Sequence, residues 1–241
     1  MIYTDSYFIF KDRKSSDYGI LVERQPNIIS PERRIVTHTI PGRSGALSIE
    51  DGSYESYVKS VECAVLTTKY MNEISAWLKG TGEVIFSNEK PYKYRARIVN
   101  NIPFTEAVKA VGLIACRFIV MFDCQPFKYS VNAENHRITL REPGRFSGDG
   151  SVPADPVITV HGSGTVLLSV NGLVLQVSGI DGYITINSDV LHCYKNNTSQ
   201  NHKVFMSFDK FPQLNPAGEF NDISWQGNVN RVEIEPNYRW V

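Results

Sequence analysis

The last third of the chain, residues 173–240, constrains the fold most, because short alternating segments recur there between Gly, Asn-Gly and Pro turns. Residues 165–170 and 173–177 flank Asn171-Gly172, a dipeptide that tolerates positive φ at both turn positions and suits a type I′ hairpin. Evenly spaced strands separated by turn residues are typical of a sandwich or a barrel. No candidate catalytic group recurs among these strands. The pattern therefore predicts a β-sandwich that holds other proteins.

The first half of the chain predicts a second β-rich domain with one helix. Period-2 alternation indicates strands over residues 18–22, 35–40 and 57–66, and a hairpin from residues 83–87 and 94–99. The run 112–122 is apolar on both faces apart from Arg117, which predicts a central strand.

The spacing of apolar residues changes to a helical one between residues 68 and 79. Met71, Ile74 and Leu78 recur there on one helical face. Thr67 or Thr68 can cap the start of the helix, and Gly80 can end it in a left-handed conformation. The predicted fold class is therefore mainly β with a single α-helix.

A Gly-, Pro- and Ser-rich stretch, residues 141–153, divides the two halves of the chain. Such a stretch favours a linker or long loop. We therefore expect an N-terminal domain over residues 1–135, a linker over 136–152 and a C-terminal sandwich over 153–241.

Composition excludes several classes of protein. Lys plus Arg and Asp plus Glu both number 25, so the chain lacks the surplus positive charge of a dedicated nucleic-acid binder. No apolar run reaches the roughly 18 residues that span a bilayer, and the N-terminus does not resemble a signal peptide. The four cysteines form no C-x-x-C pair and are predicted to be buried free thiols.

Residues that could carry chemistry do not converge in the sequence. The five histidines show no metal-ligand spacing, and His161-Gly162-Ser163-Gly164 is predicted to be a tight β-turn instead of a phosphate loop. Carboxylates are scattered near turns, which leaves open a glycosidase pair assembled from distant strands. We therefore expect no enzyme activity, no metal and no cofactor.

Arginines are the candidate contact residues. Arg33, Arg34 and Arg43 surround a Pro-Gly turn, which is either a solvated loop or a contact loop whose guanidinium groups pair with carboxylates of another subunit. Arg95 and Arg97 share one side of a predicted strand, which is solvated or faces a partner. Arg43, Arg95 and Arg97 are the predicted subunit or partner contacts.

Asp17-Tyr18-Gly19-Ile20 near the N-terminus is followed by residues 40–45, Ile-Pro-Gly-Arg-Ser-Gly. These motifs and their order resemble the distal tail protein (Dit) family of long-tailed, non-contractile phages and prophages, in which "ipGR-x-G" recurs. Residues 182–189 are similar to a family stretch that usually carries Asp at the Asn187 position. Residues 211–221 then resemble "fPxLxPGxN", and residues 223–227 continue the match.

The end of the chain, residues 236–240, is similar to the family's closing Pro-Arg-Trp segment. There are two departures from the family pattern. Ala217 stands between Pro216 and Gly218, and Asn237-Tyr238 precede Arg239-Trp240.

The resemblance implies an N-terminal β-sandwich-like domain with one helix and a C-terminal galectin-like β-sandwich. In the family six copies form a ring, single or back to back, around the channel through which DNA leaves. The ring joins the tail tube to the tip protein, a tail-associated lysin or fibre, and in some phages to receptor-binding proteins. This implies a chain at the virion tail tip, assembled in the host cytoplasm, with no membrane insertion and no sequence-specific nucleic-acid binding.

Two other classes of function stay open in the sequence. A carbohydrate-binding adhesion module would use the C-terminal sandwich, with Trp225, Trp240 and Tyr238 as an aromatic platform. A cell-wall hydrolase would act on peptidoglycan. We expect neither, because the aromatic residues are as well suited to a core or an interface and no catalytic group converges.

Overall fold

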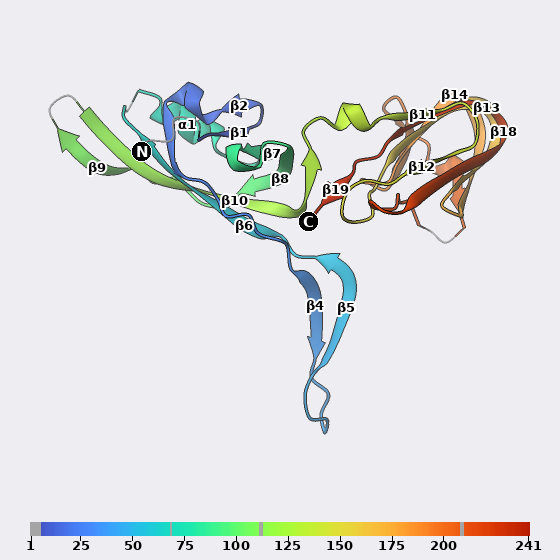
Figure 1. Cartoon of the computed structure of the whole chain (residues 1–241), viewed down its shortest axis with the longest axis horizontal. Helices are drawn as coiled ribbons and strands as arrows, with labels where there is room; N and C mark the ends of the chain where they lie inside the picture. Colours follow the sequence, from blue (N-terminus) through green and yellow to red (C-terminus); the bar gives the residue numbers. More distant parts are fainter. Residues whose placement is uncertain (1–5, 68, 111–112, 208–209) are drawn as a thin grey trace. The chain divides into compact units, whose positions relative to one another are not determined.

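The computed structural model describes residues 6–67, 69–110, 113–207 and 210–241. Residues 1–5, which bear on the expected absence of a signal peptide, the possible cap Thr68 and Gly112 lie outside the described residues. The described chain is mainly β-structure, as predicted, and divides into two compact units. Unit 1 is Met1–Val131 with Val241, and unit 2 is Asn132–Trp240 (Figure 1).

Unit 1 is built on a large antiparallel sheet with the strand order β2-β1-β7-β8-β10-β6-β3, and β9 pairs with β10. The long strand β10 pairs with both β6 and β8, which confirms the predicted central strand. The large aromatic side chains of its core include Phe8, Phe10, Phe86 and Phe122. The strand bounds are β1 (Phe8–Phe10), β2 (Arg13–Lys14), β3 (Ile20–Arg24), β6 (Tyr57–Val65), β7 (Thr81–Phe86), β8 (Tyr92–Ile98), β9 (Thr105–Ala110) and β10 (Leu113–Ser130).

The single α-helix among the described residues, α1 (Met71–Trp77), confirms the predicted helix and buries Ile74 and Trp77. The Trp77 indole stacks on Phe8, with ring centroids 5.7 Å apart, and donates a hydrogen bond to the Phe10 carbonyl at 2.9 Å. No side chain caps the start of the helix. The Thr67 hydroxyl instead accepts a hydrogen bond from the Lys69 amide before the helix begins. Two 3-10 helices, η1 (Ser15–Tyr18) and η2 (Ser87–Glu89), complete unit 1.

Strands β4 (Arg33–His38) and β5 (Leu47–Tyr54) form a separate two-stranded sheet that pairs with no other described strand. Every residue of β4 is exposed, and so is all of β5 except its last two residues. An isolated hairpin of this kind gains little stability from its own contacts. Figure 1 shows it as a ribbon distinct from the main sheet.

Unit 2 is a β-sandwich built around three long, mutually adjacent strands, β18, β13 and β14. Its strand order is β11-β18-β13-β14-β15-β16, with β12 paired to β18 and β17 paired to β14. Its core contains Ile158, Leu168, Leu175 and Ile234, each fully buried. The bounds are β11 (Ile138–Leu140), β12 (Gly144–Ser147), β13 (Val157–Val170), β14 (Leu173–Asn187), β15 (His192–Lys195), β16 (Thr198–Ser199), η3 (Ala133–His136), η4 (Asn201–Lys203), β17 (Val204–Met206), β18 (Phe220–Glu235) and β19 (Arg239–Trp240).

The predicted Asn-Gly hairpin is confirmed. Val170 of β13 pairs with Leu173 of β14, and the two turn residues have φ of 51° at Asn171 and 84° at Gly172. Positive φ at both positions defines the type I′ class that matches the twist of the strands.

Two local expectations are wrong. The stretch 136–152, expected as a linker or long loop, carries β11 and β12, which both pair with β18. Its Pro and Gly residues mark the ends of very short strands whose partner residues lie 73–96 positions later in the chain, so the pairing is invisible locally. His161 to Gly164 are not a turn but lie inside β13, where the ladder is irregular beside a bend.

Gly162 shows why glycine occupies that bend. A Cβ at this position would lie 2.1 Å from the Asn228 carbonyl oxygen of β18. We expect Gly162→Ala to lower the unfolding free energy of unit 2 by about 1–3 kcal/mol, because backbone must shift to admit the methyl group. Urea unfolding measures this. Gly144→Ala is the control, since its nearest contact would be the Leu140 side chain at 3.4 Å, and an equal loss there would contradict the prediction.

Candidate interaction surfaces

The β4–β5 hairpin presents one apolar face to solvent. Val36 pairs with Ile49, and His38 pairs with Leu47, so these four side chains project to the same side. Val36 is 43% exposed and Ile49 is 48% exposed. Large aliphatic side chains gathered on an unsupported hairpin are characteristic of a surface that another protein covers.

The hairpin arginines have different environments. The Arg33 guanidinium lies 4.9 Å from the centre of the Tyr54 ring, and Arg34 pairs with Glu55 at 2.9 Å. Arg43 lies in the exposed turn, where its amide donates to the Ile40 carbonyl. The guanidinium groups of Arg33 and Arg34 therefore contact side chains of the hairpin and its flanking residues. Arg43 lies at the exposed turn of the hairpin.

Arg95 and Arg97 lie on the solvent side of β8, as the alternation predicted. The Arg95 guanidinium lies 4.5 Å from the centre of the Tyr129 ring, and Arg97 pairs with Asp123 at 3.3 Å. The structure thus places Arg43 on the hairpin and the other two on the main sheet. Their role as subunit contacts stays a prediction.

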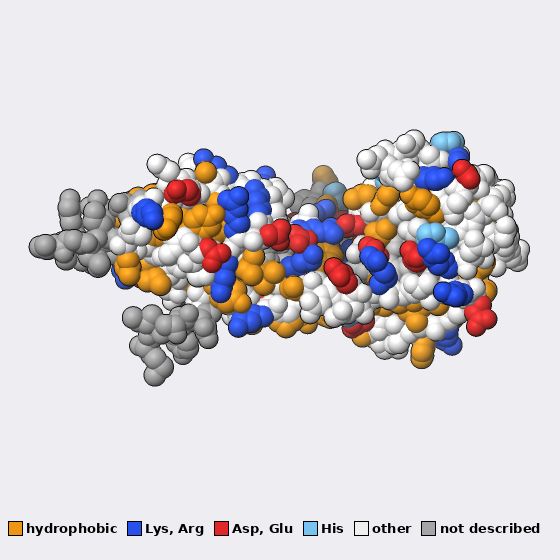
Figure 2. Space-filling view, turned by 90° about the horizontal axis from the view of Figure 1, so that it is seen from above, with side chains coloured by type: hydrophobic (Ala, Val, Ile, Leu, Met, Phe, Trp, Pro, Cys, Tyr) orange, Lys and Arg blue, Asp and Glu red, His pale blue; other side chains and the backbone are white. Residues whose placement is uncertain are grey.

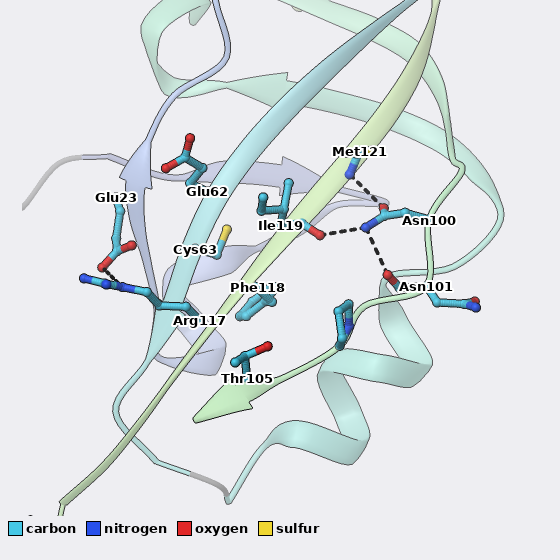
Figure 3. A pocket seen from close by; sticks show the side chains of 11 residues that line it. Glu23, Glu62, Cys63, Asn100, Asn101, Thr105, Arg117, Phe118, Ile119 and Met121 are labelled. Carbon is cyan, nitrogen blue, oxygen red and sulfur yellow. Dashed lines mark hydrogen bonds and ion pairs between the residues drawn. The ribbon is translucent and has the colours of Figure 1, made fainter. Parts of the chain in front are cut away.

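A hollow of about 460 Å³ lies between β3, β6, β10 and the loop after β8 (Figure 3). Its charged and amide groups are occupied: Arg117 pairs with Glu23 at 3.0 Å, and Asn100 donates to the Ile119 carbonyl at 2.8 Å. Ile119 and Met121 remain 42% and 37% exposed at its edge. Because its polar groups bind one another, the hollow suits apolar contact better than proton transfer.

A charged cluster lies buried in unit 1, which the sequence analysis did not foresee. Lys59 has no exposed side-chain surface, and its ammonium donates to the Glu89 carboxylate at 2.7 Å. The Tyr94 hydroxyl donates to the other Glu89 oxygen, also at 2.7 Å. Burial raises the pKa of the Glu89 carboxyl, but the hydrogen bonds from Lys59 and Tyr94 and the charges of Lys59 and Lys128 outweigh it and leave the pKa below its ordinary value.

In unit 2, side chains from the C-terminal motifs accept hydrogen bonds from backbone amides and so fix the conformation of turns. The Asn187 side-chain oxygen accepts from the amides of Asp189 and Val190, a role that Asp would fill equally well. Asn221 is fully buried, and its side-chain oxygen accepts from the Asn215 amide at 2.7 Å and from the Asn171 side chain at 2.9 Å.

The two departures from the family pattern also have a structural place. The extra Ala217 donates its amide to the Gly150 carbonyl, and Asn237 adopts a positive φ of 51° before the final strand. Arg239 pairs with Asp155 in a largely buried position. These residues hold the loops of the sandwich together, so their function is structural.

The aromatic residues considered for a sugar platform pack on the core instead. Trp225 and Trp240 are half-buried against it, and Tyr238 is only 7% exposed. Among the described residues of this unit, the exposed aromatic ones are Phe205 and Phe220. A carbohydrate platform formed by Trp225, Trp240 and Tyr238 therefore has no support.

The cysteines, the possible metal ligands and the surface charges are the remaining candidate functional groups. All four cysteines are buried and free, and burial raises the pKa of the Cys124 thiol to about 12 and that of Cys193 to about 11. Such thiols stay protonated and unreactive. Within the described ranges, no group of three or more His, Cys, Asp or Glu side chains could hold a metal ion. On the face drawn in Figure 2, Lys and Arg side chains are interspersed with Asp and Glu.

Helices of membrane-spanning length and apolarity are absent from the part of the chain that the structure describes.

A helix-bearing β-domain followed by a β-sandwich is the architecture of a solved phage hub protein. That structure is SPP1 Dit (gp 19.1), described as a paradigm of the hub adsorption apparatus in phages that infect Gram-positive bacteria. The match covers 98% of this chain and 99% of that chain, with a TM-score of 0.71 and 15% sequence identity. No protein-family model and no curated protein matches the chain. The resemblance predicted from the turn motifs is thus confirmed at the level of the fold.

Proposed function

We propose that this chain is a phage distal tail protein: a non-catalytic hub whose copies form a six-membered ring between the tail tube and the tip of the virion. Unit 1 makes the ring, and unit 2 is a docking platform for the tip protein, a tail-associated lysin or fibre, and for receptor-binding proteins. DNA leaves through the centre of the ring. The subunits assemble in the bacterial host cytoplasm.

The observation that carries this proposal is the exposed apolar hairpin of unit 1. The side chains of Val36, Leu47 and Ile49 are exposed in the described chain. Exposing clustered apolar surface to water does not stabilise a monomer. A closed ring requires each subunit to present two different, complementary surfaces. The hairpin supplies a protruding surface, and the sheet face around Ile119 and Met121 supplies a candidate for the other.

Three further observations support the proposal. The fold is that of SPP1 Dit over almost the whole of both chains, and the ordered motifs point to the same family. The net charge of zero and the interspersed charges would let DNA pass without holding it.

Unit 2 offers a row of exposed side chains suited to docking. Leu167 pairs with Gln176, which pairs with Phe205, so the three side chains form a row across β13, β14 and β17. Phe205 is 70% exposed and Leu167 is 38% exposed. Exposed aromatic and aliphatic side chains in one row resemble the centre of a protein–protein interface.

Native mass spectrometry and negative-stain electron microscopy of the purified full-length chain test the proposal. We expect particles of six copies, or of twelve where two rings join back to back. We also expect binding to the tail tube and tip proteins encoded beside this chain. A chain that stays monomeric at high concentration and binds neither partner would overturn the proposal.

A further inference from the structure

The segment that leads into the hairpin is tied to the body of unit 1 at three consecutive residues. We call residues 25–27, between β3 and β4, the hairpin root. The Gln25 side chain donates to the Ser87 hydroxyl at 2.8 Å, and the Pro26 carbonyl accepts from the Asn88 side chain at 2.9 Å. The Asn27 carbonyl accepts from the Lys59 ammonium at 3.2 Å.

These bonds converge on one short element. Ser87 and Asn88 belong to the 3-10 helix η2, and so does Glu89, which holds the Lys59 ammonium. Lys59 itself lies on β6, just after the point where the chain returns from the hairpin. The buried pair therefore connects the strand that follows the hairpin to the root that precedes it.

A buried ion pair needs an explanation other than stability. Lys59 is enclosed by aromatic rings, with its ammonium 4.7 Å from the centre of Tyr94 and 5.5 Å from that of Phe86. Apolar residues of similar volume in such a place are often as stable as the ions they replace, or more so. An apolar side chain, however, could not donate to the Asn27 carbonyl.

We propose that Lys59 and Glu89 are positioning residues that fix the hairpin root on η2 and so hold the hairpin ready for contact with a neighbouring copy. This inference rests on the proposed function in one respect, the identity of the hairpin's partner. The positioning itself depends only on the bonds within unit 1. A hairpin held in its binding orientation loses less conformational freedom on association, and this strengthens the complex.

Spin labels report the position of the hairpin directly. Ser44→Cys in the hairpin turn and Thr81→Cys at the exposed start of β7 give two labelling sites, since the four native cysteines are buried. Pulsed electron spin resonance should give a narrow distance distribution in this background. Adding Lys59→Met with Glu89→Gln should broaden it, while the thermal midpoint stays within a few degrees of the parent's.

Assembly gives the second readout, in chains without labels. The same double variant should raise the concentration for half-assembly by about tenfold, because a loosened hairpin must be ordered on binding. Lys93→Met with Glu83→Gln is the matched control. It removes an ion pair of the same type, with an N–O distance of 2.9 Å, from the solvent side of the same sheet. Neither readout should change in the control.

The outcomes separate this inference from the proposed function. An unchanged distance distribution in the double variant would overturn the positioning role, whatever the chain assembles into. The positioning role would also be overturned if the distance distribution broadened only when unit 1 unfolded. Equal broadening in the control variant would overturn it as well. A parent chain that never assembles would count against the proposed ring, while the distance measurement would still decide the positioning role.

Discussion

Replacing Lys59 alone with methionine is expected to lower the unfolding free energy of unit 1 by about 3–5 kcal/mol, because it leaves a buried carboxylate without its main partner. Glu89 is only 5% exposed at its side chain, and Lys128, 3.6 Å from its other oxygen, offsets only part of the charge. Urea unfolding of the full chain at neutral pH measures the loss. The result should be a separate, earlier transition for unit 1.

The double variant Lys59→Met with Glu89→Gln is the decisive comparison. It removes both charges and keeps an oxygen for the Tyr94 hydroxyl, so it should recover most of the lost stability. Strong coupling between the two substitutions is the expected signature of a direct pair. If the double variant were as unstable as the sum of both single variants, the pair would not act as a unit.

Replacing the apolar pair of the hairpin with charges is expected to abolish ring assembly. Val36→Lys with Ile49→Glu should raise the concentration for half-assembly by about 100-fold or more, because charged side chains buried against an apolar partner surface must be desolvated. The two residues are directly paired, so the opposite charges face each other and preserve the hairpin. Analytical ultracentrifugation over a concentration series measures the shift.

The control for this variant lies on the other side of the same hairpin. Thr37→Lys with Ser48→Glu changes the neighbouring pair and introduces the same charges. It should assemble within a few-fold of the parent chain. Equal loss in both variants would show that charge on the hairpin matters and the apolar face does not, which would contradict the proposed contact surface.

The sequence predicted those elements of secondary structure that have a local cause. The apolar spacing of Met71, Ile74 and Leu78 predicted α1, and Asn171-Gly172 predicted the type I′ turn. The cap of the helix was mispredicted, since Tyr70 occupies that place without a side-chain bond. The resemblance to distal tail proteins rested on turn motifs whose order, unlike each motif alone, is specific.

Local reasoning failed where the partner of a residue is far away in the chain. The strands β11 and β12 are formed by pairing with β18, whose partner residues lie 73–96 positions later, so their Pro and Gly residues were misread as a linker. Gly162 was misread as part of a turn for the same reason, because its constraint is the backbone of Asn228 across the sheet.

The interaction surfaces show the same limit. Arg43, Arg95 and Arg97 could be named from the sequence as exposed candidates, and they stay predictions. Lys59 could not be singled out, because its position in an alternating strand predicts only which face it occupies. The exposed state of Val36 and Ile49 was equally invisible, since the same aliphatic pattern would serve a buried strand.

The sequence by itself determined the class of fold, the α-helix and the Asn-Gly hairpin turn, because backbone preferences and the period of apolar residues act over a few neighbouring positions. The tertiary structure alone decided which apolar strand pair stays uncovered and which charged pair is buried. Burial depends on what the rest of the chain packs against each side chain, and the two strands of the hairpin pair with no other strand in the described part of the chain.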